Sequence, residues 1–223
     1  MARPLQHDRD AALQQAVALF WRRGYFATSM KEIEQALNMR PGSIYATFGN
    51  KAALFSSSLT RYTQCQVEAF FALMADYPDP FSGSEAFLRH FGGPCSTGLP
   101  SSVCFLVKSL LELEGRAEDA PLSVVRESLA TMEAAFYRAF REGTPSLTEA
   151  EARQMARWLQ KEVIGIRIMA LQIGNSPALA TLVDDSCAAL RRWRAIRLRR
   201  RGSEHGSVEK TKAKLYYRDM TLD

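Results

Sequence analysis

The chain has 223 residues, of which 47% are hydrophobic and 24% are charged, as in a globular protein with one substantial core. Its net charge of +5 is divided into +3 over residues 1–60, −5 over residues 61–190 and +7 over residues 191–223. The sequence holds no apolar run long enough to span a membrane and no apolar signal-peptide core near its start. We therefore expect a cytoplasmic protein with no membrane partner, whose basic ends suit a polyanion.

Four cysteines, Cys65, Cys95, Cys104 and Cys187, are irregularly spaced along the chain. None of them forms the Cys-x-x-Cys pair of many zinc sites, and a disulfide framework is not expected at this length in a reducing compartment. The sequence predicts four free thiols and neither a metal nor another cofactor.

Apolar residues recur at helical spacing along almost the whole chain, and strand patterns are nearly absent. The first predicted helix ends at Gly24, since glycine adopts the left-handed conformation cheaply. A short second helix over residues 30–37 ends at Asn38, which tolerates the same conformation. Pro41 then opens a very short third helix, at a position where a missing N–H costs nothing.

Six further helices are predicted beyond the third. Asn50 is expected to cap a long helix that runs to Met74. The stretch 77–84 is rich in Pro, Gly and Ser, so it is predicted to be a loop. Thr148 and Glu151 form a capping-box pattern. The six helices are expected over residues 51–74, 85–91, 103–113, 121–141, 149–173 and 177–193.

The second and third helices, joined by a tight turn, indicate a helix-turn-helix, whose second helix enters the DNA major groove. The segment FWRRGYFATSMKEIEQALNMRPGSIYATFGNKAALF resembles the N-terminal signature of the TetR family of transcriptional regulators. This resemblance extends over residues 8–55 and rests on several fixed spacings that match together, including the Gly-Ser-Ile-Tyr of the third helix. Two positions depart from the family pattern, because Asn38 replaces the usual turn glycine and Arg40 lies where a Ser or Thr cap is common.

The resemblance implies an all-α fold, with a three-helix DNA-binding head that contains the helix-turn-helix and a ligand-binding and dimerisation body of about six helices. We expect the head in residues 1–50, the body in residues 51–201 and a basic, disordered tail in residues 202–223. The resemblance further implies that the protein is a transcriptional repressor and not an enzyme. It is expected to bind an inverted-repeat double-stranded DNA operator as a homodimer. A small-molecule effector, with an electrophile as one option, is expected to release it.

Ten residues of the first two segments are predicted to contact DNA. Thr28 or Ser29 is expected to cap the second helix and bond a phosphate, and Arg40 to reach a phosphate or a guanine edge. Short side chains on the third helix bring its backbone close to the bases. The resemblance adds backbone contacts from Tyr45 and Lys51. The ten residues are Thr28, Ser29, Arg40, Pro41, Gly42, Ser43, Tyr45, Ala46, Thr47 and Lys51.

By analogy with the family's architecture, the middle helices are expected to enclose a mostly apolar ligand pocket. The last two long helices are expected to form a four-helix dimer interface with those of a second subunit. Ordinary packing inside one subunit is the alternative for both sets of residues. The pocket candidates are Cys104, Phe105, Lys108, Phe136, Phe140, Trp158 and Met169, and the interface candidates are Ile164, Gly165, Ile168, Ala188 and Ala189.

Cys104 begins a Cys-Phe-Leu-Val segment. Some TetR-like repressors with a similar segment respond to electrophiles or oxidants, so the resemblance allows thiol sensing here. Lys108 lies one helical turn further and is expected to supply the positive charge that lowers a thiol pKa. The alternative is a buried cysteine that acts as a small, inert hydrophobic residue.

Two other classes of protein remain open. One is an all-helical enzyme, although the chain has only three histidines and no phosphate-binding glycine loop or HExxH motif. The other is a partner-binding helical module that uses the acidic middle of the chain and has no DNA role. The basic run from Arg191 to Arg201 is either a second DNA contact or a helix end whose cations complement the helix dipole, and the latter is favoured.

Overall fold

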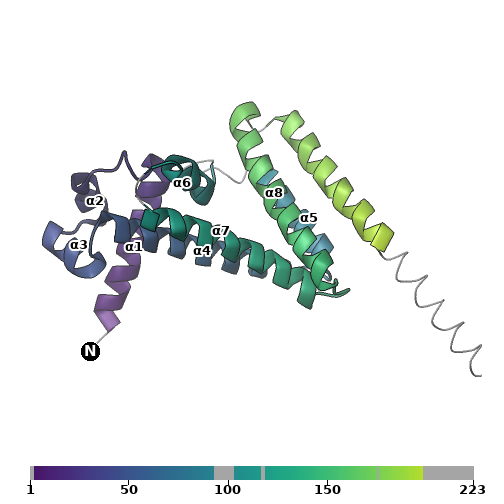
Figure 1. The fold of residues 1–223 in the computed structure, drawn as a ribbon, viewed down its shortest axis with the longest axis horizontal. Helices are drawn as coiled ribbons and strands as arrows, with labels where there is room; N and C mark the ends of the chain where they lie inside the picture. Colours follow the sequence, from purple (N-terminus) through teal and green to yellow (C-terminus); the bar gives the residue numbers. More distant parts are fainter. Residues whose placement is uncertain (1–2, 93–102, 117–118, 175, 198–223) are drawn as a thin grey trace, which may run out of the picture.

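The computed structural model describes residues 3–92, 103–116, 119–174 and 176–197 (Figure 1). Within these ranges every regular element is an α-helix, which confirms the predicted all-α class. The predicted tail, residues 202–223, and Cys95 lie outside the described residues, and no described helix is long and apolar enough to cross a membrane. The helices are α1 (Arg3–Arg23), α2 (Met30–Leu37), α3 (Pro41–Phe48), α4 (Lys51–Met74), α5 (Pro80–Gly92), α6 (Phe105–Leu113), α7 (Asp119–Glu142) and α8 (Glu149–Ile173), followed by a helix over residues 177–197.

Local sequence signals set several helix ends as predicted. Asn38 ends α2 with a left-handed φ of 51°. The Asn50 side chain caps α4, because its Oδ1 accepts a hydrogen bond from the Ala53 amide at 2.8 Å. Thr148 and Glu151 make both hydrogen bonds of the capping box at the start of α8. These signals act between residues at most three apart, so they hold whatever the rest of the chain does.

Helix α5 begins earlier than predicted, and the loop expected over residues 77–84 is wrong from Pro80 onward. Asp79 precedes the helix, and its Oδ1 accepts hydrogen bonds from the Phe81 and Ser82 amides at 2.9 and 3.1 Å. Pro80 occupies the first helical position, where an N–H would have no intrahelical partner. The Pro-rich stretch therefore marks a helix start.

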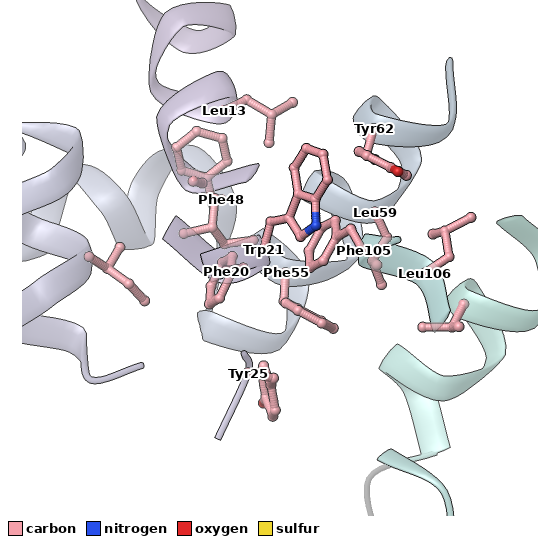
Figure 2. Close-up of a cluster of buried hydrophobic side chains, with 14 of the residues drawn as sticks. Leu13, Phe20, Trp21, Tyr25, Phe48, Phe55, Leu59, Tyr62, Phe105 and Leu106 are labelled. Carbon is pink, nitrogen blue, oxygen red and sulfur yellow. The ribbon is translucent and has the colours of Figure 1, made fainter. Parts of the chain in front are cut away.

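Two buried clusters fill the molecule, and α4 and α7 contribute to both. In the first, the Phe55 ring packs edge-on against Phe20 at 5.0 Å and Phe105 at 5.7 Å between ring centroids (Figure 2). The second holds α5, α8 and helix 177–197 around Phe70 of α4. Figure 1 shows α4 and α7 side by side, running from the head to the far helices. Since α1, α4 and α6 share the first cluster, the head has no core of its own.

Three arginines of the basic run fasten helix 177–197 to the body. Each pairs with a carboxylate on or beside α5 or near the start of α8, so they face away from α3. A single exposed ion pair contributes only about 0–1 kcal/mol, but the three together define where this helix lies. This placement favours a packing role over a second DNA contact for the described part of the run. The pairs are Arg191 with Glu85, Arg194 with Asp79 and Arg197 with Glu151.

Candidate functional site

The outer face of α3 carries most of the predicted contact residues. Ile44 and Phe48 of this helix are buried against α1 and α4. Because they are four residues apart, they occupy one face and leave the opposite face to solvent. Seven of the ten predicted residues are exposed on or just before this helix, namely Arg40, Pro41, Gly42, Ser43, Tyr45, Ala46 and Thr47.

An open groove of about 770 Å³ runs beside this face, between α1, the α2–α3 turn and α3. It is lined by four predicted residues, Arg40, Ser43, Ala46 and Thr47, and by Arg9 and Gln15 of α1. Arg9 was not predicted from the sequence. Its guanidinium lies 5.5 Å from the centre of the Phe48 ring. No local spacing indicates this contact, because the two residues are 39 positions apart and meet only through the fold.

Ser29, and not Thr28, caps α2. The Ser29 hydroxyl accepts from the Glu32 amide at 3.3 Å, and the Glu32 carboxylate accepts from the Ser29 amide at 2.8 Å. The hydrogen bond from the Ser29 amide, and then the one that the Ser29 hydroxyl donates to the same carboxylate at 2.9 Å, hold the pKa of Glu32 below its usual value. Thr28 is buried, and its hydroxyl donates to the Gly24 carbonyl at 2.6 Å. The predicted phosphate contact from the Thr28 side chain is therefore wrong, since this hydroxyl faces the interior.

Lys51 is the first residue of α4 and is half-buried. Its Nζ lies 4.5 Å from the centre of the Tyr25 ring, within the range of a cation–π interaction. Tyr25 is itself buried. The fold thus holds a positive charge beside the amino-terminal amides of α4, where α3 ends.

A second, partly open cavity of about 40 Å³ lies among α4, α6, α7 and α8. Of the predicted pocket residues, Cys104 and Phe136 line it. The Tyr62 hydroxyl lies 3.7 Å from the Cys104 sulfur. Burial, with a smaller contribution from Cys104, raises the pKa of Tyr62 well above its ordinary value, so its phenol stays protonated. The lining residues are Tyr62, Gln66, Phe87, Cys104, Leu106, Leu129, Met132, Phe136, Gln160, Val163, Ile164 and Arg167.

Four aromatic or apolar residues predicted for the pocket lie elsewhere, because they fill the core. Phe105 packs between the Phe55 and Tyr62 rings. Phe140 packs on Phe81 with 5.5 Å between ring centroids. The remaining two, Trp158 and Met169, are half-buried against the second cluster. An apolar stripe at helical spacing identifies a buried face without saying whether that face meets side chains or a cavity.

Lys108 also lies elsewhere than predicted. Its ammonium donates to the carbonyls of Trp21 and Arg22 at 3.0 and 2.7 Å. These carbonyls belong to the last turn of α1, where unpaired acceptors and the helix dipole attract a cation. Lys108 therefore binds the head, and the expectation that it charges the surroundings of Cys104 is wrong.

Glu112 makes a second contact between α6 and the head. Its carboxylate accepts hydrogen bonds from the amides of Tyr25 and Phe26, which lie in the turn between α1 and α2. A Cβ on Gly24 would lie 2.6 Å from a Glu112 carboxylate oxygen, and the φ of Gly24 is +91°. The turn therefore requires glycine at this position both for its conformation and for the approach of Glu112.

The predicted interface residues divide into two groups. Gly165 and Ile168 are exposed on α8, and a Cβ on Gly165 would meet no atom within 4 Å, so nothing in the described part of the subunit requires a glycine there. Ala188 and Ala189 are half-buried. Ile164 is half-buried and lines the cavity, which agrees with the alternative of packing inside one subunit. Further apolar side chains are exposed on these two helices, namely Leu171, Leu182 and Ile196.

Comparison with known proteins supports the helix-turn-helix reading. Residues 12–57 match the family model described as bacterial regulatory proteins, tetR family. The chain is 37% identical over 86 residues to the HTH-type transcriptional repressor ComR of Escherichia coli. That match covers 34% of this chain and 41% of ComR, so it spans less than half of ComR's length.

Two further likenesses extend over most of the chain. It is 25% identical to the uncharacterized HTH-type transcriptional regulator YezE of Bacillus subtilis, over 85% of this chain and 100% of YezE. It also superposes with a TM-score of 0.68 on a cysteine mutant of the TetR family transcriptional regulator CifR, in a structure with 26-base-pair operator DNA. The identity is 25%, over 83% of this chain and 96% of CifR. The compared proteins are named as transcriptional regulators and not as enzymes.

Proposed function

Since this chain belongs to the TetR family of bacterial regulatory proteins, we propose that it is a transcriptional repressor that binds an inverted-repeat operator as a homodimer. The observation that carries the proposal is the exposed face of α3, whose buried residues, Ile44 and Phe48, hold it against the head. The likeness to CifR, solved with its operator DNA, supports the same role for this chain. The proposed head is residues 1–50 and the proposed body residues 51–201.

The chemistry of α3 suits close approach to base edges. Gly42, Ser43 and Ala46 present little or no side chain, so the helix backbone can lie deep in a major groove. A Cβ on Gly42 would meet no atom within 4 Å among the described residues, so the absence of a side chain there has no role in their packing. Arg9 and Arg40, on opposite sides of the groove, add positive charge suited to phosphates.

Dimerisation is proposed because one helix of eight residues makes few base contacts. A symmetric dimer doubles them on two half-sites about 34–36 Å apart, or multiples of that. The exposed apolar side chains of α8 and helix 177–197, together with Gly165, supply a surface on which a second copy can pack.

Release by an effector is proposed to run through α6 as well as α4. Helix α4 begins two residues after α3 ends and continues into the body. Helix α6 places Cys104 at the cavity and Lys108 and Glu112 on the head. A ligand that enlarges the cavity displaces α6 and so pulls on the turn before α2. Such a ligand releases DNA only if it binds the displaced state more tightly than the DNA-bound state.

An electrophile is proposed as a second kind of inducer, because Cys104 lines the same cavity. Addition of its thiolate sulfur to a carbon–carbon double bond forms one S–C bond, and the resulting carbanion takes a proton from water. The adduct occupies the cavity as a reversibly bound ligand does, so both kinds of effector lead to the same displacement of α6.

The test is DNA binding measured by fluorescence anisotropy. Duplexes are selected from a random pool, and a fragment from beside the protein's own gene is measured alongside them. We expect an inverted repeat with two protein copies per duplex, and binding that weakens as salt rises. Binding to no duplex above the level of a scrambled sequence, or selection of non-palindromic sites by a monomer, contradicts the proposal.

A further inference from the structure

A second open groove, of about 350 Å³, lies between α1 and α4. Three of its lining residues on α4 are Ser57, Arg61 and Gln64, whose intervals of four and three residues place them along one face of the helix. Seven residues correspond to about 10 Å along the helix axis. From α1 the groove is lined by Arg9. The α1–α4 groove therefore extends along two turns of α4 and receives a guanidinium from each of the two helices.

The two guanidiniums of the α1–α4 groove have no acidic partner in the described part of the chain. Neither Arg9 nor Arg61 forms an ion pair there, and none of the described residues that line the groove is Asp or Glu. Arginines of the body are commonly paired, as Arg157 is with Glu133. Arg61 is half-buried, so its charge loses part of its hydration without a carboxylate in exchange. The groove therefore favours an anion.

The groups around Arg61 suit a phosphate in particular. A guanidinium presents a planar fork of donors, to which two phosphate oxygens can bind at once. Ser57 brings a hydroxyl to the same groove, and the exposed Gln64 brings an amide. Arginine, serine and glutamine side chains are among the groups that commonly contact DNA phosphates. The chemistry of the α1–α4 groove is thus that of a contact with a nucleic-acid backbone.

Arg9 connects this groove with the one beside α3, because it lines both. The basic surface therefore continues from Arg40 at the start of α3, past Arg9, to Arg61 on α4. A duplex extends beyond the base pairs that α3 contacts, and each of its strands carries a phosphate about every 3.4 Å along the axis. The phosphates of this flank are the next anions along the basic surface.

We propose that the α1–α4 groove binds a backbone phosphate of the operator's flank, outside the base pairs that α3 contacts, with Arg61 as its main cation. The inference rests on the proposed operator binding, which it extends from the head onto the body. Arg61 lies ten residues after Lys51, about 15 Å further along α4. The flank therefore has to curve toward α4 to meet it, and a duplex cut off at the half-site offers no such phosphate.

The experiment compares two duplexes that carry the same selected operator. One ends at the last base pair of the inverted repeat, and the other continues at each end for about ten base pairs, one helical turn. Affinity is measured by fluorescence anisotropy over a salt series. We expect the wild-type protein to bind the longer duplex about tenfold more tightly at low salt. The slope of log affinity against log salt should be steeper by about one unit for each subunit, because each further phosphate contact releases counterions.

Three variants assign this difference to Arg61. Arg61→Met should bind both duplexes alike, whereas Arg61→Lys retains the charge and should keep most of the advantage of the longer duplex. Arg9→Met should weaken binding to both duplexes, since Arg9 also lines the groove beside α3. The matched control is Arg157→Met, which removes the same charge from an exposed position of α8 and should behave as wild type. Circular dichroism verifies folding, and the comparison in the wild-type protein is decisive if Arg61→Met does not fold.

The inference is overturned if the wild-type protein binds both duplexes with the same affinity and salt slope, or if Arg61→Met keeps the advantage of the longer one. It is also overturned if Arg61 holds only a free anion. In that case inorganic phosphate, at matched ionic strength, raises the melting temperature of the DNA-free wild-type protein but not of Arg61→Met, while the flank has no effect. Binding to neither duplex contradicts the proposed function and the inference with it, whereas equal binding to both contradicts the flank contact alone.

Discussion

Glu112 of α6 accepts a hydrogen bond from the backbone amide of Tyr25 at 2.9 Å, although the two residues are 87 positions apart. The other carboxylate oxygen accepts from Phe26 at 2.8 Å. A carboxylate that receives two amide donors makes charge-assisted hydrogen bonds, which are stronger than neutral ones. The contact ties the middle of the chain to the turn that leads into the helix-turn-helix, so it is a direct target for testing how the body controls the head.

Glu112→Gln should lower the free energy of unfolding by about 1–3 kcal/mol, because an amide can accept from one of the two backbone donors and leaves the other without a partner. Effector-induced loss of operator affinity should also shrink, since α6 no longer holds the turn firmly. Chemical denaturation and anisotropy with and without an effector measure the two effects. The matched control, Glu114→Gln, removes an exposed ion pair with Arg126 in the same segment and should change neither.

Lys51→Ala should weaken binding to every duplex and reduce the slope of log affinity against log salt by about one unit, because one phosphate contact is lost. Thr47→Val should instead change which bases are preferred, since Thr47 is exposed on the α3 face. Anisotropy over a salt series on selected and altered operators measures both. Lys161→Ala, at an exposed lysine of the body, serves as the control. An unchanged salt slope for Lys51→Ala together with altered base preference would contradict the assignment.

Gly165→Leu should convert the proposed dimer into a monomer while leaving the subunit folded. A Cβ at this position meets no atom within 4 Å among the residues that the structure describes, so the new side chain projects into the space that a second copy is expected to fill. Sedimentation at micromolar concentration gives the oligomeric state, and circular dichroism gives the fold. Ala130→Leu adds the same bulk to an exposed position of α7 and should sediment as wild type. If Gly165→Leu remains a dimer, the interface lies elsewhere.

Cys104→Ser should abolish release of the operator by N-ethylmaleimide while leaving release by an unreactive ligand in place. Cys104 lines the cavity, whereas Cys65 is half-buried on α4 and Cys187 is buried against α5. The control is Cys65→Ser, which should respond to the maleimide as wild type does. Equal release of the wild-type protein and Cys104→Ser by the maleimide would exclude the thiol as the sensor.

Asp79 should make stability depend on pH in the acid range. Burial acts to raise its pKa, but hydrogen bonds from Ser82 and Phe81 and the charge of Arg194 outweigh burial, so the pKa lies below the ordinary value of 3.8. A lowered carboxyl pKa stabilises the folded state above the unfolded pKa, and this contribution is lost as pH falls through the folded value. Asp79→Asn retains a cap but not the charge. It should be less stable than wild type at neutral pH, by a margin that shrinks in acid.

Thermal denaturation at several pH values measures this margin. Asp76→Asn, at an exposed position one turn earlier, is the control and should show no such convergence. A margin for Asp79→Asn that stays constant down to the lowest pH at which the protein folds would contradict the prediction, because it would mean that the charge on Asp79 does not stabilise the folded state.

Local capping signals were sufficient to predict the end of α2 and the starts of α4 and α8, since Asn38, Asn50 and Thr148 act on neighbours in sequence. The three helices of the head could be predicted from the spacing of the helix-turn-helix motif. The direction in which a side chain points across the fold could not be predicted from the sequence. Lys108 lies one turn from Cys104 in sequence, yet its ammonium binds carbonyls of α1 that no local pattern brings near.

The cavity shows the same contrast between what local sequence predicts and what only the fold determines. Of the residues predicted for a ligand pocket, Cys104 and Phe136 line this cavity, whereas Phe140 and Trp158 meet other side chains. Gln160 and Arg167 were missed, because a polar residue on an amphipathic helix is expected to face solvent. Only the packing of α8 against α7 and α5 turns this part of its surface inward, and an apolar stripe gives no signal of how far a polar residue at its edge is buried.

The Phe20–Phe55–Phe105 contacts bear on whether the DNA-reading unit can be exchanged between proteins of this architecture. A chimera that joins residues 1–60 of this chain to a foreign body places Phe20 and Phe55 against a different α6 surface, so that the edge-on fit with Phe105 is lost. An altered operator preference is therefore more safely transplanted by replacing the exposed residues of α3 than by swapping the whole head. Along a natural lineage, a change at Phe105 should be accompanied by compensating changes in α1 or α4.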